Sequence, residues 1–238
     1  MIITYWSDYA CPYCYIGEAR LKRAIKAMEL EGRVQLVPRA FELNPAAPRE
    51  VESDTATRFA AKYRMTLQEA MAQIEHISRL GMAEGIDFRY ATTQYTNTFD
   101  AHRLMKLALS KNDPELADKT NELLFAAYFT KNLRLAEESV LVEAGIMAGL
   151  QESEILEVLR SDRFGLEVRA DERAAAERGI GGVPFFIFPG GFSIPGATSF
   201  SSFKDALFSA MNFEKSNAIE VPEQCGSNGC SVDVARNN

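Results

Sequence analysis

Strand-like sequence is confined to the two ends of this 238-residue chain, and residues 46–164 between them are helical in pattern. "MIITYW" predicts a buried strand at residues 2–6, and the alternating "RVQLVPRAFEL" predicts a second. Pro38 lacks a donor for a strand ladder, so it favours the edge of a sheet for this second strand. Near the other end, "VPFFIF" and "FSIPG" predict two more strands, separated by the turn "PGG". Because the long helical block has no strand to alternate with, the pattern predicts an α/β fold whose sheet is split by a large helical insertion.

Helical spacing runs through the central block. Further helices are expected at 98–110, 114–130, 135–149 and 152–160. In the first part of the block, several apolar residues at helical spacing are expected to lie on one face of a helix. We interpret this face as part of the core, not as a ligand-binding stripe. It consists of Leu67, Met71, Ile74, Ile77 and Leu80. One helix from Cys11 to about Gly32, one closed by Gly179 and one at 199–213 complete the α/β part. The expected organisation is an α/β domain at 1–45 and 165–213, an all-helical insertion domain at 46–164, and a C-terminal tail at 214–238.

Charge and hydropathy exclude several classes of partner. The formal net charge is −7 and no cluster of lysines and arginines offsets it, so we expect no nucleic acid and no membrane surface as partner. The longest nearly charge-free run, residues 179–197, is broken by prolines and glycines and cannot be a spanning helix. If Met1 is the true start, there is no room for a secretory signal before residue 11, which favours a cytoplasmic protein with reduced thiols.

The stretch "YACPYCYIG" places two cysteines at the start of the first predicted helix. Pro12 suits the first turn of a helix because it has no N–H to leave unpaired. Cys11 then lies beside the free N–H groups and the positive end of the helix, which stabilise a thiolate, and Cys14 lies one turn further in. A disulfide catalyst needs an attacking thiolate and a second thiol to release the mixed disulfide. We therefore predict Cys11 as the nucleophile and Cys14 as the resolving cysteine, with no organic cofactor.

A second feature is "GGVPFF", where Val183 and Pro184 precede a predicted strand. A cis peptide bond there would turn the backbone groups of Val183 outward, so that an extended substrate could pair with them beside Cys11. It would also crowd out a metal ion. The residues alone favour an ordinary trans proline that opens the strand.

Three other polar residues have weaker claims to a catalytic role. Asp8 could handle protons, but we interpret it as a cap for the following turn and leave it out of the catalytic set. His102 could be a proton shuttle, but its neighbours favour a hydrogen-bonded packing residue. His76 has no companion ligand and no role is assigned to it.

The tail carries a second pair, Cys225 and Cys230, in "QCGSNGCS". The dipeptide Asn228-Gly229 can fold the chain back, so a disulfide there is geometrically easy. An extended tail from Asn212 spans about 43 Å at about 3.3 Å per residue, which is long enough to reach Cys11. The pair could exchange with Cys11 and Cys14, or it could be adventitious. All four cysteines could instead bind zinc, although Pro12 and a proline opposite the first pair oppose a tetrahedral site, and no metal is predicted.

Three ordered motifs identify a family. "SDYACPYCYIG", "NTFDAHRL" at 97–104 and "GVPFFIF" together resemble the DsbA family, and most closely its cytosolic FrnE-like branch. The resemblance implies a thioredoxin fold interrupted by a helical domain, with Cys11 as nucleophile, Cys14 as resolving residue and Pro184 as a cis proline. The resemblance extends to Cys225 and Cys230, which it implies form an auxiliary redox pair, as in the tails of FrnE-like proteins. Pro12, Tyr13 and Val183 are predicted to contact substrate.

The predicted function is that of a thiol-disulfide oxidoreductase or disulfide isomerase. Its partners would be protein thiols and disulfides, or small thiols such as glutathione. The main alternative is a glutathione-dependent transferase of the kappa class or a 2-hydroxychromene-2-carboxylate isomerase. These relatives are similar in fold and in the pattern of Asn97-Thr98 and Ala101-His102, but they hold glutathione with a serine where this chain has Cys11. A third hypothesis is a binding protein whose thiols act only as a redox-sensitive clasp.

Overall fold

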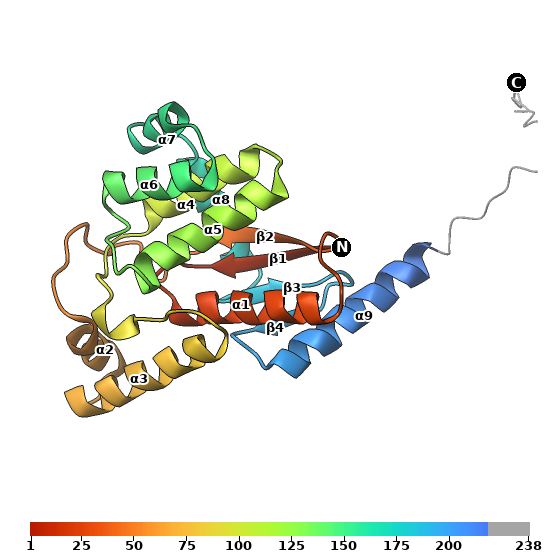
Figure 1. Ribbon diagram of the computed structural model, residues 1–238, viewed down its shortest axis with the longest axis horizontal. Coiled ribbons are helices and arrows are strands. Elements are labelled where there is room, and N and C mark those ends of the chain that lie inside the picture. The colour runs from red at the N-terminus through yellow and green to blue at the C-terminus, as the bar shows by residue number, and fades with distance from the viewer. Residues whose placement is uncertain (219–238) are drawn as a thin grey trace, which may run out of the picture.

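A mixed sheet of four strands is the frame of the structure, a computed structural model that describes residues 1–218 (Figure 1). The strands lie in the order β2-β1-β3-β4, where β1 is parallel to β2 and the other neighbours are antiparallel. Their bounds are Ile2–Ser7 for β1, Gln35–Ala40 for β2, Phe185–Ile187 for β3 and Ser193–Pro195 for β4. Pro38 lies in β2 at the sheet edge, as the sequence predicts, and the two C-terminal strands also form where expected.

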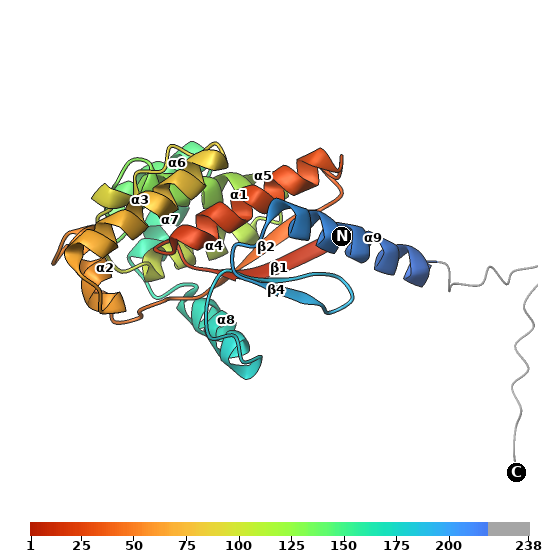
Figure 2. The same cartoon turned by 90° about the horizontal axis from the view of Figure 1, so that it is seen from below.

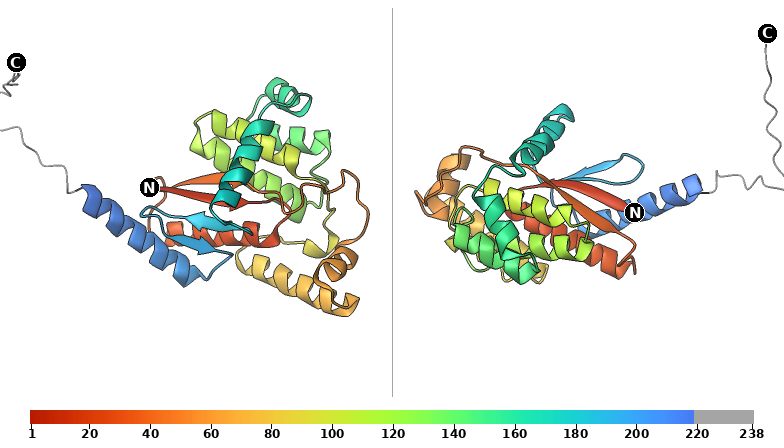
Figure 3. Two further views of the ribbon diagram at one scale, coloured as in Figure 1. Left: turned by 180° about the vertical axis from the view of Figure 1, so that it is seen from behind. Right: turned by 90° about the horizontal axis from the view of Figure 1, so that it is seen from above.

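Helices cover both faces of this sheet. Helices α1 (Pro12–Ala27) and α9 (Phe200–Ala218) pack on one face, and α8 (Gly165–Glu177) packs on the other (Figures 2 and 3). Because side chains alternate along a strand, Ile3 and Tyr5 of β1 are buried against α1 and α9, whereas Trp6 packs with Ala175 and Ile180 on the side of α8.

Between β2 and α8 the chain is helical, as the sequence predicts. The elements are α2 (Thr55–Tyr63), α3 (Leu67–Ala83), the short 3-10 helix η1 (Tyr90–Thr92), α4 (Phe99–Ser110), α5 (Pro114–Phe129), α6 (Glu138–Ala148) and α7 (Glu152–Leu159). In Figure 1, α4 to α7 form one group above the sheet, and α2 and α3 lie near the start of α1. The division into domains at residues 45, 164 and 213 stays a prediction.

A buried polar network ties the insertion to the sheet and α1. The Glu18 carboxylate, on α1, accepts hydrogen bonds from the Tyr5 hydroxyl at 2.8 Å and from the Asn121 amide at 2.7 and 2.8 Å. The Tyr9 hydroxyl donates to the carbonyl oxygen of Asn121 at 3.0 Å, and Lys22 forms an ion pair with Glu18. The charges of Glu18 and Lys22 therefore have partners, which is the condition for keeping a charge inside a fold.

Three details of the helices differ from the sequence-based expectations. First, α1 ends at Ala27 instead of near Gly32, because Glu29 adopts a left-handed conformation with φ of 55°. The N–H of Leu30 then bonds back to the carbonyl of Ile25 and closes the helix. Second, α9 continues to Ala218, beyond residue 213, where the tail was expected to begin. Third, the sequence analysis names no separate helix at α2.

The expected core face of α3 is also wrong in part. Leu67 and Met71 are 53% and 58% exposed, whereas Ile74 and Ile77 are buried as predicted. The buried face is completed by the small residues Ala70 and Gly81, which allow α3 to approach its neighbours closely. Small residues carry a weak hydropathy signal, so the sequence pattern assigns Leu67 and Met71 to the buried face of α3 in place of Ala70 and Gly81. Among residues 1–218, no helix has both the length and the hydropathy that crossing a membrane requires.

Candidate active site

The two cysteines flank the first turn of α1, directly after the turn that follows β1. Cys11 is the N-cap residue of α1 and Pro12 occupies the first helical position, as predicted. The N–H of Cys11 bonds to the carbonyl of Asp8 at 3.0 Å, and no side chain caps the helix. The Cys11 sulfur therefore lies at the positive end of α1, where a thiolate is stabilised. Both cysteines are free thiols.

The two thiols have different surroundings. Cys14 is 1% exposed, and this burial raises the pKa of its thiol well above the usual range. The neighbouring Cys11 raises it further, whereas the backbone N–H of Asp8 and the Ser7 hydroxyl act weakly in the opposite direction. Cys11 lines a pocket and Cys14 does not. The order in which Cys11 meets the substrate and Cys14 acts afterwards stays a prediction.

We expect alkylation by iodoacetamide to separate the two thiols in the Cys225→Ser/Cys230→Ser variant. Because the pKa of Cys14 is raised, its thiol is protonated at neutral pH, and its thiolate fraction grows about tenfold for each pH unit below that pKa. At pH 7 mass spectrometry should find label on Cys11 alone, and label on Cys14 should appear only at more alkaline pH, because its pKa is raised. Equal labelling of both cysteines at pH 7 in the folded protein would contradict this prediction; denatured protein is the control.

Val183 and Pro184 lie opposite the cysteines. The peptide bond between them is cis, as the family resemblance implies. The Cys11 thiol donates a weak hydrogen bond to the Val183 carbonyl, with 3.5 Å between sulfur and oxygen. Residues 172 positions apart are thus brought together at the nucleophile. The contribution of Val183 and Pro184 to catalysis stays a prediction.

Asp8 connects the cysteine turn to two distant segments. Its carboxylate accepts from the N–H of Ala10 at 3.2 Å, the N–H of Leu43 at 2.8 Å and the hydroxyl of Thr98 at 2.8 Å. The expected cap for the following turn is therefore present, because Ala10 belongs to that turn. The bonds to Leu43 and Thr98 go further, since they fix the turn against the end of β2 and the start of α4.

His102 is a packing residue, as the sequence analysis interprets it, but it lacks the expected hydrogen bond. Its side chain is buried, and its ring lies 5.0 Å from that of Tyr9. The Nε2 atom is 3.5 Å from the Asp8 carboxylate and has no hydrogen-bond partner within the described chain. Thr98 and His102 of the second motif therefore both meet Asp8 of the first.

A pocket of about 690 Å³ opens beside Cys11. The turn that carries Cys11, with Pro12 and Tyr13, forms one wall of the pocket. Tyr13 is 39% exposed. Val183 and the segment after β2 add to it, and α2, α3 and the region of η1 form the remaining walls. The predicted contact residues Pro12, Tyr13 and Val183 all line this pocket; whether they touch substrate stays a prediction.

The pocket residues that α2 contributes were not predicted from the sequence, and neither were Tyr90 and Tyr95; those of α2 are Arg58, Phe59, Lys62 and Tyr63. A usable signal exists in "DTATRFAAKY". Asp54 is a good N-cap and accepts a hydrogen bond from the N–H of Thr57, which marks the start of a helix. Arg58 and Lys62 are four residues apart and share a face of that helix.

Within residues 1–218, no group of three or more histidine, cysteine, aspartate or glutamate side chains could hold a metal ion. Cys225 and Cys230 lie outside the described residues. The proposed exchange of this pair with Cys11, and the four-cysteine zinc alternative, are therefore not tested by the structure.

Sequence comparison now decides the family. A model of the DSBA-like thioredoxin domain matches residues 2–208. The chain belongs to this family. Its members share the DsbA-like thioredoxin fold found here, which carries a large helical content between β2 and α8.

Solved structures agree with this assignment. A probable DsbA oxidoreductase from Streptomyces coelicolor is 32% identical, with a TM-score of 0.84, over 98% of this chain and 100% of that one. A 2-hydroxychromene-2-carboxylate isomerase is 16% identical with a TM-score of 0.64, over 94% of this chain and all of its own. The cytosolic disulfide reductase DsbM from Pseudomonas aeruginosa, in its structure with GSH, is 16% identical with a TM-score of 0.59, over 92% and 100% of the two chains. The last two likenesses are similarities of fold.

Proposed function

We propose that this DsbA-family protein is a thiol-disulfide oxidoreductase or disulfide isomerase of the FrnE-like branch, acting in the cytoplasm. The observation that carries the proposal is the pairing of Cys11, which is 4% exposed but lines the pocket at a helix start, with Cys14, which is 1% exposed, lies one turn behind it and does not line the pocket. The Cys11 thiolate attacks one sulfur of a substrate disulfide, forming a mixed disulfide and releasing the other sulfur as a thiolate. Cys14 then loses its proton and attacks the sulfur of Cys11, which releases the second substrate thiolate.

This sequence of steps moves two electrons from the cysteine pair to the substrate. In the opposite direction, substrate thiols reduce the Cys11–Cys14 disulfide and leave oxidised. The carbonyl of Val183 can orient the Cys11 thiol in either direction of the reaction, because it accepts a weak hydrogen bond from that thiol. Cys225 and Cys230 would serve as an auxiliary pair that exchanges electrons with the first.

The partners would be protein disulfides or small thiols such as glutathione. The solved complex of DsbM with GSH supports a small thiol, as does a pocket of peptide-like size beside Cys11. The likeness to the isomerase does not favour its reaction here. A serine hydroxyl only stabilises a bound thiolate, whereas a Cys11–Cys14 disulfide would be reduced by that thiol and the reduced pair would exchange with its disulfide.

The proposal is tested by two assays on the purified protein: reduction of insulin with dithiothreitol as electron donor, and refolding of scrambled ribonuclease. We expect the wild-type protein to accelerate at least one of them above dithiothreitol alone. We also expect the Cys225→Ser/Cys230→Ser variant to be slower than wild type, with the first cysteine pair still active. An inert wild-type protein in both assays would refute the proposed function, and unchanged rates in the double variant would refute the auxiliary role.

A further inference from the structure

An arginine in the pocket beside Cys11 has no partner in the part of the chain that the structure describes. The Nε and Nη2 atoms of Arg58 are buried and make no hydrogen bond. No carboxylate of residues 1–218 forms an ion pair with it, whereas Arg39, Arg103 and Arg169 each pair with a carboxylate. Arg58 as a whole is only partly buried, but two buried donors without an acceptor are costly, so these two atoms need a physical explanation.

The position of the guanidinium group is well defined. Its Cζ atom lies 4.1 Å from the centroid of the Tyr95 ring, which supports one face of the plane. The two unpaired atoms, Nε and Nη2, are on one edge of the guanidinium. Two parallel N–H groups on such an edge match the two oxygens of a carboxylate, which is the geometry of the bidentate arginine–carboxylate pair.

The charge of the pocket agrees with an anionic ligand. Lys62 lies one helical turn after Arg58 on α2 and also lines the pocket. The lining residues include no aspartate or glutamate, although the protein as a whole carries a net charge of −7. A cationic hollow on an acidic protein raises the local concentration of anions near Cys11.

We propose that Arg58, assisted by Lys62, binds the carboxylate of a low-molecular-mass disulfide or thiol while the sulfur of that compound reacts at Cys11. The inference rests on the proposed function and names its small substrate class as carboxylate-bearing thiol compounds. A pocket of about 690 Å³ has the size of a small peptide, and its tyrosines supply apolar walls around the charged group. Arg58 binds the carboxylate of the half that becomes attached to Cys11 and releases it when Cys14 displaces that half; the carboxylate takes no part in the bond changes.

The reaction balances without a further cofactor. The Cys11 thiolate forms a bond with one sulfur of the disulfide, and the carboxylate-bearing half that leaves does so as a thiolate. Cys14 then displaces the second half, so the substrate gains two electrons and the protein becomes the Cys11–Cys14 disulfide. A dithiol such as dithiothreitol reduces the pair again in the assay.

The test compares acids with their own esters. Dithiodipropionate and glutathione disulfide are each mixed with prereduced protein, in parallel with their methyl esters, which retain the disulfide but lose the carboxylate charge. Formation of the Cys11–Cys14 disulfide is followed by quenching and mass spectrometry. The Cys225→Ser/Cys230→Ser background limits the reaction to the first pair.

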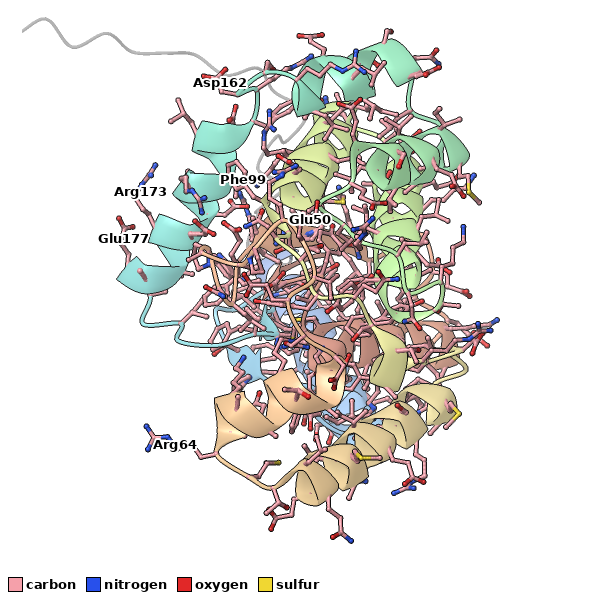
Figure 4. The ribbon with its side chains drawn as sticks, turned by 90° about the vertical axis from the view of Figure 1, so that its left-hand side faces the viewer. Glu50, Arg64, Phe99, Asp162, Arg173 and Glu177 are labelled. Carbon is pink, nitrogen blue, oxygen red and sulfur yellow. The ribbon has the colours of Figure 1, made fainter. Side chains whose placement is uncertain are left out.

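We expect Arg58→Gln to slow oxidation by at least one acid about 10- to 100-fold, the range for a lost charge-assisted hydrogen bond, and to leave the esters within about twofold. The rate of oxidation of Arg58→Lys by the acid should lie between those of wild type and Arg58→Gln, because lysine keeps the charge and loses the paired N–H groups. The matched control is Arg64→Gln, which removes the same charge at the end of the same helix. Arg64 does not line the pocket and projects away from the rest of the molecule (Figure 4).

The possible outcomes distinguish failure of the carboxylate site from failure of the proposed oxidoreductase function. If neither acids nor esters oxidise the wild-type protein, the proposed small-disulfide chemistry fails. If acids and esters react equally fast with wild type, the carboxylate site is refuted even though the oxidoreductase function stands. The comparison in wild type does not depend on how well Arg58→Gln folds. An equal loss in Arg64→Gln would indicate general electrostatic attraction and would also refute a specific role of Arg58.

Discussion

Cys11→Ser is expected to abolish disulfide exchange, with a loss of at least about a thousandfold relative to wild type. A serine hydroxyl at the start of α1 is not ionised at neutral pH and forms no disulfide, so the first attack cannot occur. Cys14 cannot replace it, because its sulfur is buried and does not line the pocket. The measurement is the rate of insulin reduction in the Cys225→Ser/Cys230→Ser background, which prevents the tail pair from contributing.

The matched variant is Cys14→Ser in the same background. It retains the attacking thiolate but cannot release the mixed disulfide, so mass spectrometry should find substrate covalently attached to Cys11. Two results would contradict these roles: turnover that survives Cys11→Ser, or a Cys14→Ser variant that accumulates no adduct. The first result would mean that the thiol facing the pocket is not the nucleophile.

Asp8→Ala is expected to lower the free energy of unfolding of the reduced protein by about 3 kcal/mol. The substitution leaves the N–H of Ala10, the N–H of Leu43 and the hydroxyl of Thr98 without their acceptor, and an unpaired buried group costs about 1–3 kcal/mol. It also frees the cysteine turn from β2 and α4, so turnover should fall with stability. Urea unfolding monitored by circular dichroism measures the change.

Two further variants control this experiment. Asp8→Asn keeps one acceptor oxygen and should cost less than Asp8→Ala. Asp162→Ala removes an exposed carboxylate that projects from the loop between α7 and α8 (Figure 4), and it should change stability by less than about 0.5 kcal/mol. A stability of Asp8→Ala equal to that of the Asp162→Ala control would show that the three hydrogen bonds do not hold the turn.

The chain's local patterns were sufficient to predict its frame. A β-branched and aromatic run marks β1, alternating residues mark β2, and Pro38 marks the sheet edge, because these signals depend on neighbours within a few positions. Cys11 and Pro12 mark the start of α1 for the same reason. The cis peptide bond at Val183 was different, since base rates favour trans and only the order of three motifs implied otherwise.

The remaining parts of the site depend on contacts that no local pattern encodes. Asp8 meets Leu43 and Thr98 across 35 and 90 residues, so its role as more than a turn cap becomes visible only in the folded chain. The contact of His102 with Tyr9 also joins distant parts of the sequence, so no local pattern encodes it. The placement of α2 beside Cys11 is likewise tertiary, and this is why Arg58 was not among the predicted site residues although its helix begins with a readable cap.

The walls of the pocket come from different parts of the chain, and this division has a consequence for engineering. The reactive sulfur is supplied by the turn between β1 and α1, whereas the cationic wall is supplied by α2, which the cysteine chemistry does not require. A replacement of α2 surface residues by those of a relative should therefore exchange substrate preference while leaving the electron-transfer step unaltered. Libraries confined to residues 55–63 offer a direct route to new client selectivity in this scaffold.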